Sequence, residues 1–212
     1  MAKEGKDNKK GFGDIIENSP KSELEDAMLN KCESLFNDGN FDDTIQCCIA
    51  LENKKPDISI THYYKGMSIY NKGNLDEAIV ELEKGIKKDP TFWLLHSAKG
   101  LVLYRKGKYD DALKSLNESL KYEMDLSTLV LAGVCAIMTQ NNVLAEGYIK
   151  KAANIDVKTS AEIFDSFISA LLAAGALPAD MQKKVETARQ KMKEEISKLE
   201  EIEKIVRKKK KK

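Results

Sequence analysis

Apolar and polar positions follow a helical period along this chain, and the whole pattern repeats about every 34 residues. Around residues 59–71, for example, Tyr63, Met67 and Tyr70 fall on one stripe, three or four positions apart, which is the spacing of one face of an α-helix. A second helical segment follows after a short turn, and the same pair of segments recurs before and after it. The sequence therefore predicts an all-α chain of repeated helix–turn–helix units.

The turn inside each unit carries the clearest repeated text. Glycines stand 34 residues apart, at Gly39, Gly73 and Gly107, within the segments LFNDGNFDDTI, IYNKGNLDEAI and LYRKGKYDDAL. A glycine here supplies the left-handed backbone that ends the first helix, and the acidic residues after it complement the dipole of the second helix. Pro56 and Pro90 follow the second helices, where a helix must stop.

These signals place the units near residues 25–58, 59–92, 93–125 and 126–158. The fourth unit is one residue out of phase, and its turn reads Gln140-Asn141-Asn142, where we expect an asparagine to become left-handed. Small residues recur where the two helices of a unit must approach closely, namely at Gly66, Gly100, Gly133, Ala78, Ala112 and Ala145. A larger side chain there, as in Ala112→Leu, is expected to cost about 1–3 kcal/mol by overpacking.

This pattern resembles the tetratricopeptide repeat, a helix–turn–helix unit of 34 residues, over about residues 22–157. The resemblance implies a right-handed α-solenoid of about four such units within residues 19–157. Two positions depart from the family pattern. One holds His62 and His96 instead of a large aromatic residue, and the other holds lysine instead of an aliphatic residue, at Lys31, Lys65 and Lys99. We expect these lysine stems to lie along the seams between units, with their ammonium groups in water.

Two further helices are predicted after the array, within residues 159–206. Residues 160–174 are apolar on most faces, which predicts a buried capping helix. Residues 179–206 contain no helix breaker and space their apolar residues mostly by four and then three, as in a coiled coil. The first half of this long helix is expected to cap the last repeat, because a repeat array needs a terminal unit with a polar outer face.

The first 18 residues hold few apolar side chains and are predicted to form a flexible arm, residues 1–18. Helical order is expected from Ser19-Pro20, with a capping box between Ser22 and Glu25. The start lacks the apolar stretch of a secretory signal, and no run of 18 apolar residues occurs. We therefore expect a cytoplasmic protein without a transmembrane helix.

The net charge of +1 conceals an asymmetry between the ends of the chain. Residues 13–57 hold eleven acids and four lysines, whereas the last six residues carry +6, at Arg207, Lys208, Lys209, Lys210, Lys211 and Lys212. A run of cations without aromatic residues attracts RNA phosphates or anionic lipid head groups by charge alone, with no sequence readout. The other interpretation is a solvated tail without function.

Few residues suggest catalysis. The sequence contains no phosphate loop, dinucleotide-binding fingerprint or activated Ser or Cys nucleophile. His62 and His96 occupy equivalent positions of adjacent units, so a metal or acid–base pair is one hypothesis and helix packing is the other. The cysteines show no metal-ligand spacing and are expected to be buried or half-buried thiols, with a zinc or redox site as the alternative. They are Cys32, Cys47, Cys48 and Cys135. We expect no enzyme activity, no metal and no cofactor.

The family resemblance implies that residues of the first helices line a concave face that binds peptides or helices. Carried over by position, this face is aromatic and aliphatic with little charge, which suits a protein interface. The predicted groove residues are Tyr63, Tyr64, Met67, Tyr70, Asn71, Leu94, Leu101, Tyr104, Arg105, Val134 and Met138. In the competing interpretations, the C-terminal helices or the N-terminal arm fill this groove, or Tyr70 and Tyr104 belong to the core.

Some family members clamp acidic chaperone tails with charged residues of their first helices. The matching positions here lack the required positive charge and hold Leu29, Glu33, Tyr64, Leu94 and Ala98. The sequence therefore favours a different kind of non-enzymatic scaffold or adaptor, which binds a peptide or helix of a partner protein. The alternative is an RNA- or ribosome-associated assembly factor that docks through its basic tail. The sequence does not indicate the oligomeric state.

Overall fold

The computed structural model describes residues 23–173, together with residues 175, 182–183, 185–187, 189–190, 194 and 197–198. In the first of these ranges eight helices follow one another without a strand: α1 (Glu23–Asn37), α2 (Phe41–Lys54), α3 (Ser59–Asn71), α4 (Leu75–Lys88), α5 (Trp93–Arg105), α6 (Tyr109–Tyr122), α7 (Leu126–Met138) and α8 (Asn142–Ala173). The predicted all-α fold is confirmed.

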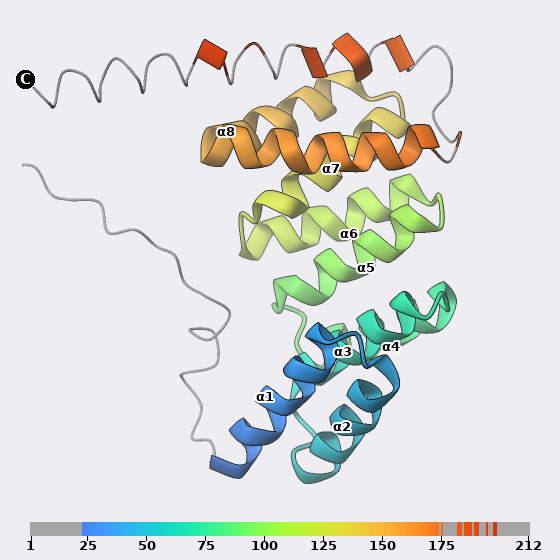
Figure 1. The fold of residues 1–212 in the computed structure, drawn as a ribbon, viewed down its shortest axis with the longest axis vertical. Helices are drawn as coiled ribbons and strands as arrows, with labels where there is room; N and C mark the ends of the chain where they lie inside the picture. Colours follow the sequence, from blue (N-terminus) through green and yellow to red (C-terminus); the bar gives the residue numbers. More distant parts are fainter. Residues whose placement is uncertain are drawn as a thin grey trace, which may run out of the picture.

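The helices stack in a row, and each packs against the next one along the chain (Figure 1). The pairs α1–α2, α3–α4 and α5–α6 each form one layer of the row. The first helices of adjacent layers also touch, α1 with α3, α3 with α5 and α5 with α7. This second set of contacts gathers the first helices on one side of the stack, which is the arrangement of an α-solenoid. The solenoid prediction is therefore confirmed.

The turns between paired helices follow the predicted glycine pattern, with one exception. Gly39, Gly73 and Gly107 have φ angles of 76°, 91° and 74°, the left-handed conformation that glycine adopts without strain. In the fourth turn we expected an asparagine in this role, but Gln140 itself adopts a φ of 60°. Gln140 stands 33 residues after Gly107, as the phase of the fourth unit requires. The position with a positive φ angle is therefore set by the length of the unit and not by the type of side chain.

The predicted close approaches between paired helices are confirmed. A Cβ atom added to Gly66 would lie 2.7 Å from a side-chain carbon of Leu82, and one added to Gly100 would lie 2.6 Å from Leu116. These distances are shorter than real Cβ contacts allow. The fit at Gly133 is looser, since the nearest carbon would lie 3.0 Å away. Glycine is thus required most strictly in the second and third units.

Helix α8 contains a break at Asp156, whose φ of −154° and ψ of 104° are not helical. The carboxylate of Asp156 accepts a hydrogen bond from the backbone N–H of Thr159 at 3.0 Å and so caps the second part of the helix. That second part packs into the apolar core around α7 through Phe164, Ile168 and Leu171. A buried helix in this segment agrees with the prediction made for residues 160–174.

The described residues between 182 and 198 are helical, as predicted for this segment. Val185 is buried in the same core as Ile168. The guanidinium of Arg189 forms an ion pair with Asp165, with 2.8 Å between Nε and Oδ1. These two contacts place Val185 and Arg189 against the second part of α8.

The cysteine prediction is wrong for one pair. Cys32 in α1 and Cys47 in α2 form a disulfide, with their Cα atoms 5.5 Å apart. Cys48 and Cys135 are buried free thiols, and burial raises the pKa of each to about 12. Spacing in the sequence did not reveal the pair, because the hairpin of α1 and α2 brings together two residues that are 15 positions apart.

The predictions for the two chain ends concern residues that the structure does not describe. These are the arm at residues 1–18, the helix start at Ser19-Pro20, the capping box of Ser22, most of the coiled-coil seam and the tail at residues 207–212. They stay predictions. Within the described ranges, none of the helices combines the length and the apolarity that crossing a bilayer requires.

Candidate functional site

A groove of about 580 Å³ lies at the turn edge of the second and third layers, and the second part of α8 contributes one wall. It is lined by Tyr70, Asn71, Gly73, Leu75, Tyr104, Arg105, Tyr109, Ala170 and Leu171. We call these nine residues the tyrosine groove. Its residues come from the ends of α3 and α5, from the turn after α3, from the first residues of α4 and α6, and from α8.

The repeat itself positions the tyrosines of this groove. Tyr70 and Tyr104 stand 34 residues apart in the last turns of α3 and α5, and Tyr109 opens α6 directly after the turn. The Tyr104 ring lies 6.0 Å from the Tyr109 ring and meets Phe167 of α8 edge-on at 5.6 Å. Burial raises the pKa of Tyr104 to about 12, and nearby Tyr109 adds to the rise. The groove therefore has a packed wall with neutral phenol groups.

Two polar side chains stand at the exposed rim of the tyrosine groove. Arg105 forms no ion pair with any residue that the structure describes, and it is one of only three arginines beside 32 lysines. The amide nitrogen of Asn71 donates to the Met67 carbonyl at 2.9 Å, so its amide oxygen remains as an acceptor. Aromatic walls beside a guanidinium and an amide can contact an apolar side chain and a carboxylate or carbonyl of a peptide.

Four predicted groove residues line the tyrosine groove, namely Tyr70, Asn71, Tyr104 and Arg105. Of the others, Leu94 and Leu101 are partly buried, and Met138 lines a neighbouring pocket. Tyr63 is also partly buried, and its ring lies 5.3 Å from that of Tyr64. The repeat therefore brings together the positions at the end of each first helix, but not those nearer its middle.

Four predicted groove residues are buried in the core, namely Tyr64, Met67, Tyr104 and Val134, and for these the prediction of an accessible surface is wrong. For Tyr104 the competing interpretation holds, because its side chain belongs to the core although it lines the tyrosine groove. Met67 packs with Leu82, Val134 is fully buried in the core of α7, and Tyr64 packs against Phe36 at 5.5 Å between ring centroids. The second part of α8 shares the core that buries Val134. The competing interpretation, in which a C-terminal helix covers the predicted face, thus holds for the fourth unit.

Five residues of the tyrosine groove were not predicted: Gly73, Leu75, Tyr109, Ala170 and Leu171. A signal existed for the first three, because residues of the turn and the first residue of the next helix recur with the repeat and share its edge with Tyr70. No repeat signal marked Ala170 and Leu171, since α8 follows the last regular unit. Only the path of the chain after Asp156 brings them to the groove.

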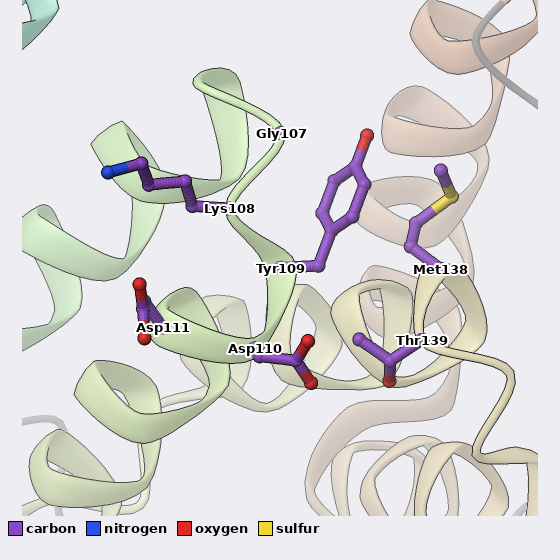
Figure 2. A pocket seen from close by; sticks show the side chains of 7 residues that line it. All are labelled: Gly107, Lys108, Tyr109, Asp110, Asp111, Met138 and Thr139. Atoms are coloured by element: carbon purple, nitrogen blue, oxygen red, sulfur yellow. The ribbon is translucent and has the colours of Figure 1, made fainter.

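A second pocket, of about 370 Å³, adjoins the tyrosine groove at the turn edge of the third and fourth layers (Figure 2). It is lined by Gly107, Lys108, Tyr109, Asp110, Asp111, Met138 and Thr139. Figure 2 shows the Tyr109 ring and Met138 next to each other, with the side chains of Asp110 and Thr139 facing one another below them. Lys108 and Asp111 point to the opposite side of the turn.

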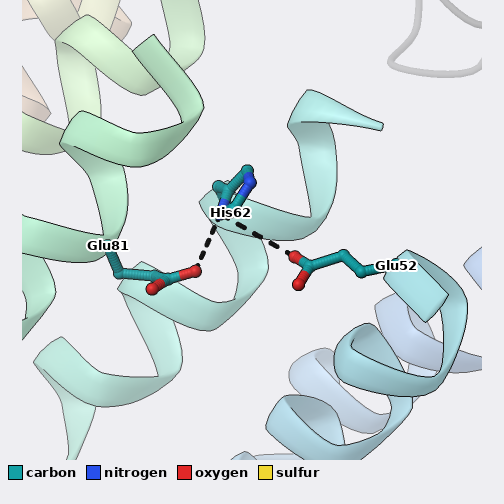
Figure 3. A group of neighbouring side chains, drawn as sticks. All are labelled: Glu52, His62 and Glu81. Atoms are coloured by element: carbon teal, nitrogen blue, oxygen red, sulfur yellow. Dashed lines mark hydrogen bonds and ion pairs between the residues drawn. The ribbon is translucent and has the colours of Figure 1, made fainter. Parts of the chain in front are cut away.

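A buried polar cluster lies at the seam between the first two layers (Figure 3). His62 Nδ1 donates to Glu81 Oε1 at 2.7 Å and lies 3.7 Å from Glu52 Oε1. One oxygen of each carboxylate and the imidazole nitrogen all lie within 4.8 Å of one another, a spacing at which side chains can share a metal ion. The prediction singled out His62 but missed both glutamates.

Lysine occupies the place that a metal ion would need in this cluster. Lys65 Nζ lies 2.7 Å from Glu81 Oε1 and 2.9 Å from Glu52 Oε2. Burial favours protonated Glu81, but hydrogen bonds from His62, Lys65 and Lys84 outweigh it and hold the pKa of Glu81 well below its usual range. Burial disfavours the charge of Lys65, yet its bonds to Glu81 and Glu52 raise its pKa. The cluster is therefore an ion-pair network.

The two histidines do not share a site. His62 bonds to Glu81, whereas His96 Nε2 lies 2.8 Å from the carbonyl oxygen of Pro90 and its ring stacks with Tyr122. Both occupy packing positions, as one of the two hypotheses proposed. The expectation that lysine ammonium groups reach water is wrong at Lys65, which is largely buried in the ion-pair network.

The comparisons with known proteins agree with this architecture. Residues 67–170 match the family model described as Psidin, N-terminal TPR repeats region. Structures of MamA are similar in fold. A structure of MamA residues 41 to the end from Desulfovibrio magneticus RS-1 has a TM-score of 0.60 and 14% sequence identity, and covers 83% of this chain and 98% of that chain.

A crystal structure of MamA protein gives a TM-score of 0.58 at 16% identity, and covers 83% of this chain and 95% of that chain. At this level of identity the likeness extends to the fold alone. Curated proteins gave no match. The 34-residue period, the stacked hairpins and these matches together identify the kind of repeat from which the chain is built.

Proposed function

Because this chain is a tetratricopeptide repeat protein, we propose that it is a non-enzymatic scaffold that binds a peptide or helix of a partner protein in the tyrosine groove. The observation that carries the proposal is the composition of that groove. Tyr70 and Tyr109 are partly exposed beside an Arg105 side chain that lacks an ion-pair partner among the described residues. Tyrosine and arginine, together with tryptophan, are enriched among the residues that dominate the affinity of protein interfaces.

A peptide suits the groove better than a small metabolite. The groove is open at the turn edge and shared by three separate parts of the chain, namely the ends of α3, α5 and α8. Such a surface offers several side-chain contacts in a row but encloses no ligand. Repeat arrays use extended surfaces of this kind because each layer contributes the same positions.

The test compares proteins captured from native extract by the immobilised full chain and by two variants. Tyr70→Ser with Arg105→Gln removes two groove contacts, and Tyr122→Ser is the matched control because Tyr122 is an exposed tyrosine of α6 outside the groove. Truncating a residue that dominates an interface costs about 2 kcal/mol or more, which is roughly 30-fold in affinity. Partners of the groove should be lost with the double variant and retained with the control.

Circular dichroism and thermal melting must show that both variants stay folded. If the folded double variant captures every protein that the unchanged chain captures, the groove proposal is wrong. A chain without residues 207–212 tests the alternative of an RNA- or ribosome-associated factor. Binding through the basic tail should fall steeply with salt and with tail removal, whereas binding through the groove should change little.

A further inference from the structure

Two ion pairs link successive layers of the array at the turn edge. Lys72 pairs with Asp42, and Lys106 pairs with Asp76. In both pairs the lysine directly precedes the turn glycine of one unit, and the aspartate is the second residue of the second helix in the unit before. Both pairs also span 30 residues. We call them the turn ladder. At this position, therefore, the carboxylate binds an ammonium group that reaches across from the next layer.

The turn ladder is interrupted at its next step. Asp110 stands in α6 at the position of Asp42 and Asp76, but the residue before the fourth turn is Thr139 instead of a lysine. Among the described residues, no lysine or arginine forms an ion pair with Asp110. Its neighbour Asp111 is different, because it pairs with Lys114 at 2.9 Å. The third layer thus keeps the aspartate of the turn ladder, but the fourth layer lacks the lysine that would pair with it.

The interruption coincides with the second pocket of about 370 Å³. The short side chain of Thr139 faces Asp110 across this pocket, and Tyr109 and Met138 form an apolar wall above them (Figure 2). The Thr139 hydroxyl donates to the Ala136 carbonyl at 3.2 Å, so its lone pairs remain as acceptors. The pocket therefore presents a carboxylate and a hydroxyl at one end and apolar surface along one side.

We propose that this pocket binds a lysine or arginine side chain of a partner protein. The cationic head donates to the Asp110 carboxylate and to the Thr139 hydroxyl, and the aliphatic stem lies against Tyr109 and Met138. The turn ladder is the independent observation, since equivalent aspartates bind lysine in the two preceding layers. The proposal goes beyond the groove function, because it names the chemistry of a separate contact, and it does not rest on that function.

The probe is Nα-acetyl-lysine methylamide, titrated into the ¹⁵N-labelled full chain and followed by backbone amide chemical shifts. The neutral control is Nα-acetyl-glutamine methylamide. A single side chain should bind weakly, with saturation in the millimolar range. The expected shifts are confined to the amides around Tyr109, Asp110 and Thr139. Shifts that do not saturate, or that follow every acidic residue of the surface, would overturn the proposal.

Three variants sharpen the titration. Thr139→Lys supplies the omitted donor and closes the pocket from within, and Asp110→Asn removes the charge of the acceptor. Asp76→Asn is the matched control, because it breaks an existing ion pair outside the pocket. Binding should weaken about tenfold or more with the first two variants, as expected for a lost charge-assisted hydrogen bond. Equal binding by all three variants would contradict the proposal.

A chain without residues 207–212 is titrated in parallel. If the basic tail of the chain itself occupied the pocket, its removal would free the site and tighten binding of the probe. That result would identify an internal occupant and overturn the assignment to a partner. Unchanged affinity would support a partner side chain. Neither result depends on the tyrosine groove, so failure here leaves the proposed groove function standing.

Discussion

The seam between the first and second layers is ionic, whereas the seam between the third and fourth layers is mostly apolar. Three buried positions of the repeat define the contrast. They hold His62, Lys65 and Glu81 in the second unit, and Leu129, Ala132 and Tyr148 two units later. In the ionic seam, the charge of Lys65 is paired with the carboxylates of Glu52 and Glu81. The apolar seam continues into α8 and supplies the core that holds one wall of the tyrosine groove.

The stacking of the helical hairpins and the chemistry of the side chains packed between layers are therefore separate requirements. The stacking depends on left-handed turns and on glycines such as Gly66 and Gly100 that admit no Cβ atom. The interface between layers can be formed by charged or by apolar side chains, provided that every buried charge has a partner. One consequence is that the front of the array should respond to charge and pH, whereas its back should respond to side-chain volume.

The largest effect is expected from breaking the ionic seam. Lys65→Met leaves half-buried Glu52 without its lysine and leaves buried Glu81 with only His62 and Lys84, which should lower the free energy of unfolding by about 3 kcal/mol. Urea denaturation followed by circular dichroism measures this loss. Replacing Glu52, His62, Lys65 and Glu81 together by apolar residues of similar size should recover most of it. If Lys65→Met costs less than about 1 kcal/mol, the value typical of a surface ion pair, the cluster does not act as a buried ion-pair network.

Acid should weaken the same seam. Because hydrogen bonds hold the pKa of folded Glu81 below its unfolded value, the stabilisation is present at neutral pH and is lost as the pH falls from about 5 downward. Thermal melts between neutral pH and about pH 3 should therefore show a falling melting temperature, with a smaller slope for Glu81→Gln. An identical slope for the two proteins would place the acid sensitivity elsewhere.

The disulfide gives the first unit a covalent closure that the fourth unit lacks. Reducing the bond between Cys32 and Cys47 should cost about 3 kcal/mol, the chain-entropy value for a loop of this length. Thiol titration of the denatured chain checks the bond itself. It should find two free thiols, those of Cys48 and Cys135, before reduction and four thiols after it. Four thiols without reductant would show that the bond is absent.

Overpacking should distinguish the tight units from the looser fourth unit. Gly100→Ala places a methyl group 2.6 Å from Leu116, and the overpacking cost of about 1–3 kcal/mol should exceed the gain of about 1 kcal/mol in helix propensity. Gly133→Ala meets its nearest carbon at 3.0 Å and should be close to neutral. Chemical denaturation of the two variants tests the order. A larger loss at Gly133 would contradict the packing described for the two layers.

The smallest effect is expected from the turn ladder. Asp76→Asn removes an exposed ion pair with Lys106 and should cost less than about 1 kcal/mol. Thr139→Lys adds a pair of the same kind with Asp110 and should stabilise by a similarly small amount at low salt. Melting temperatures measured at low and high salt test both, because screening weakens exposed pairs. A salt-independent difference would mean that the turn ladder contributes by packing instead of charge.

Periodicity predicted the parts of the molecule that repeat. The turn glycines and the small crossing residues recur at fixed spacing and were placed correctly. Tyr70 and Tyr104 recur at the ends of the first helices and line one groove, although Tyr104 is buried. Contacts between non-equivalent positions were not predictable in this way. The Cys32–Cys47 bond, the partnership of Glu52 with Lys65 and the wall that α8 adds to the groove each depend on how separate segments meet in space.

The claim that partners bind the tyrosine groove is tested most directly by site-specific photo-crosslinking in native extract. A photoreactive phenylalanine analogue replaces Tyr70 in one chain and Val80, an exposed residue of α4 outside the groove, in another. We expect the label at Tyr70 to crosslink a protein partner, the label at Val80 to give no such product, and Arg105→Gln to reduce the amount of the Tyr70 product. Equal products from both positions, or products from Val80 alone, would contradict this claim.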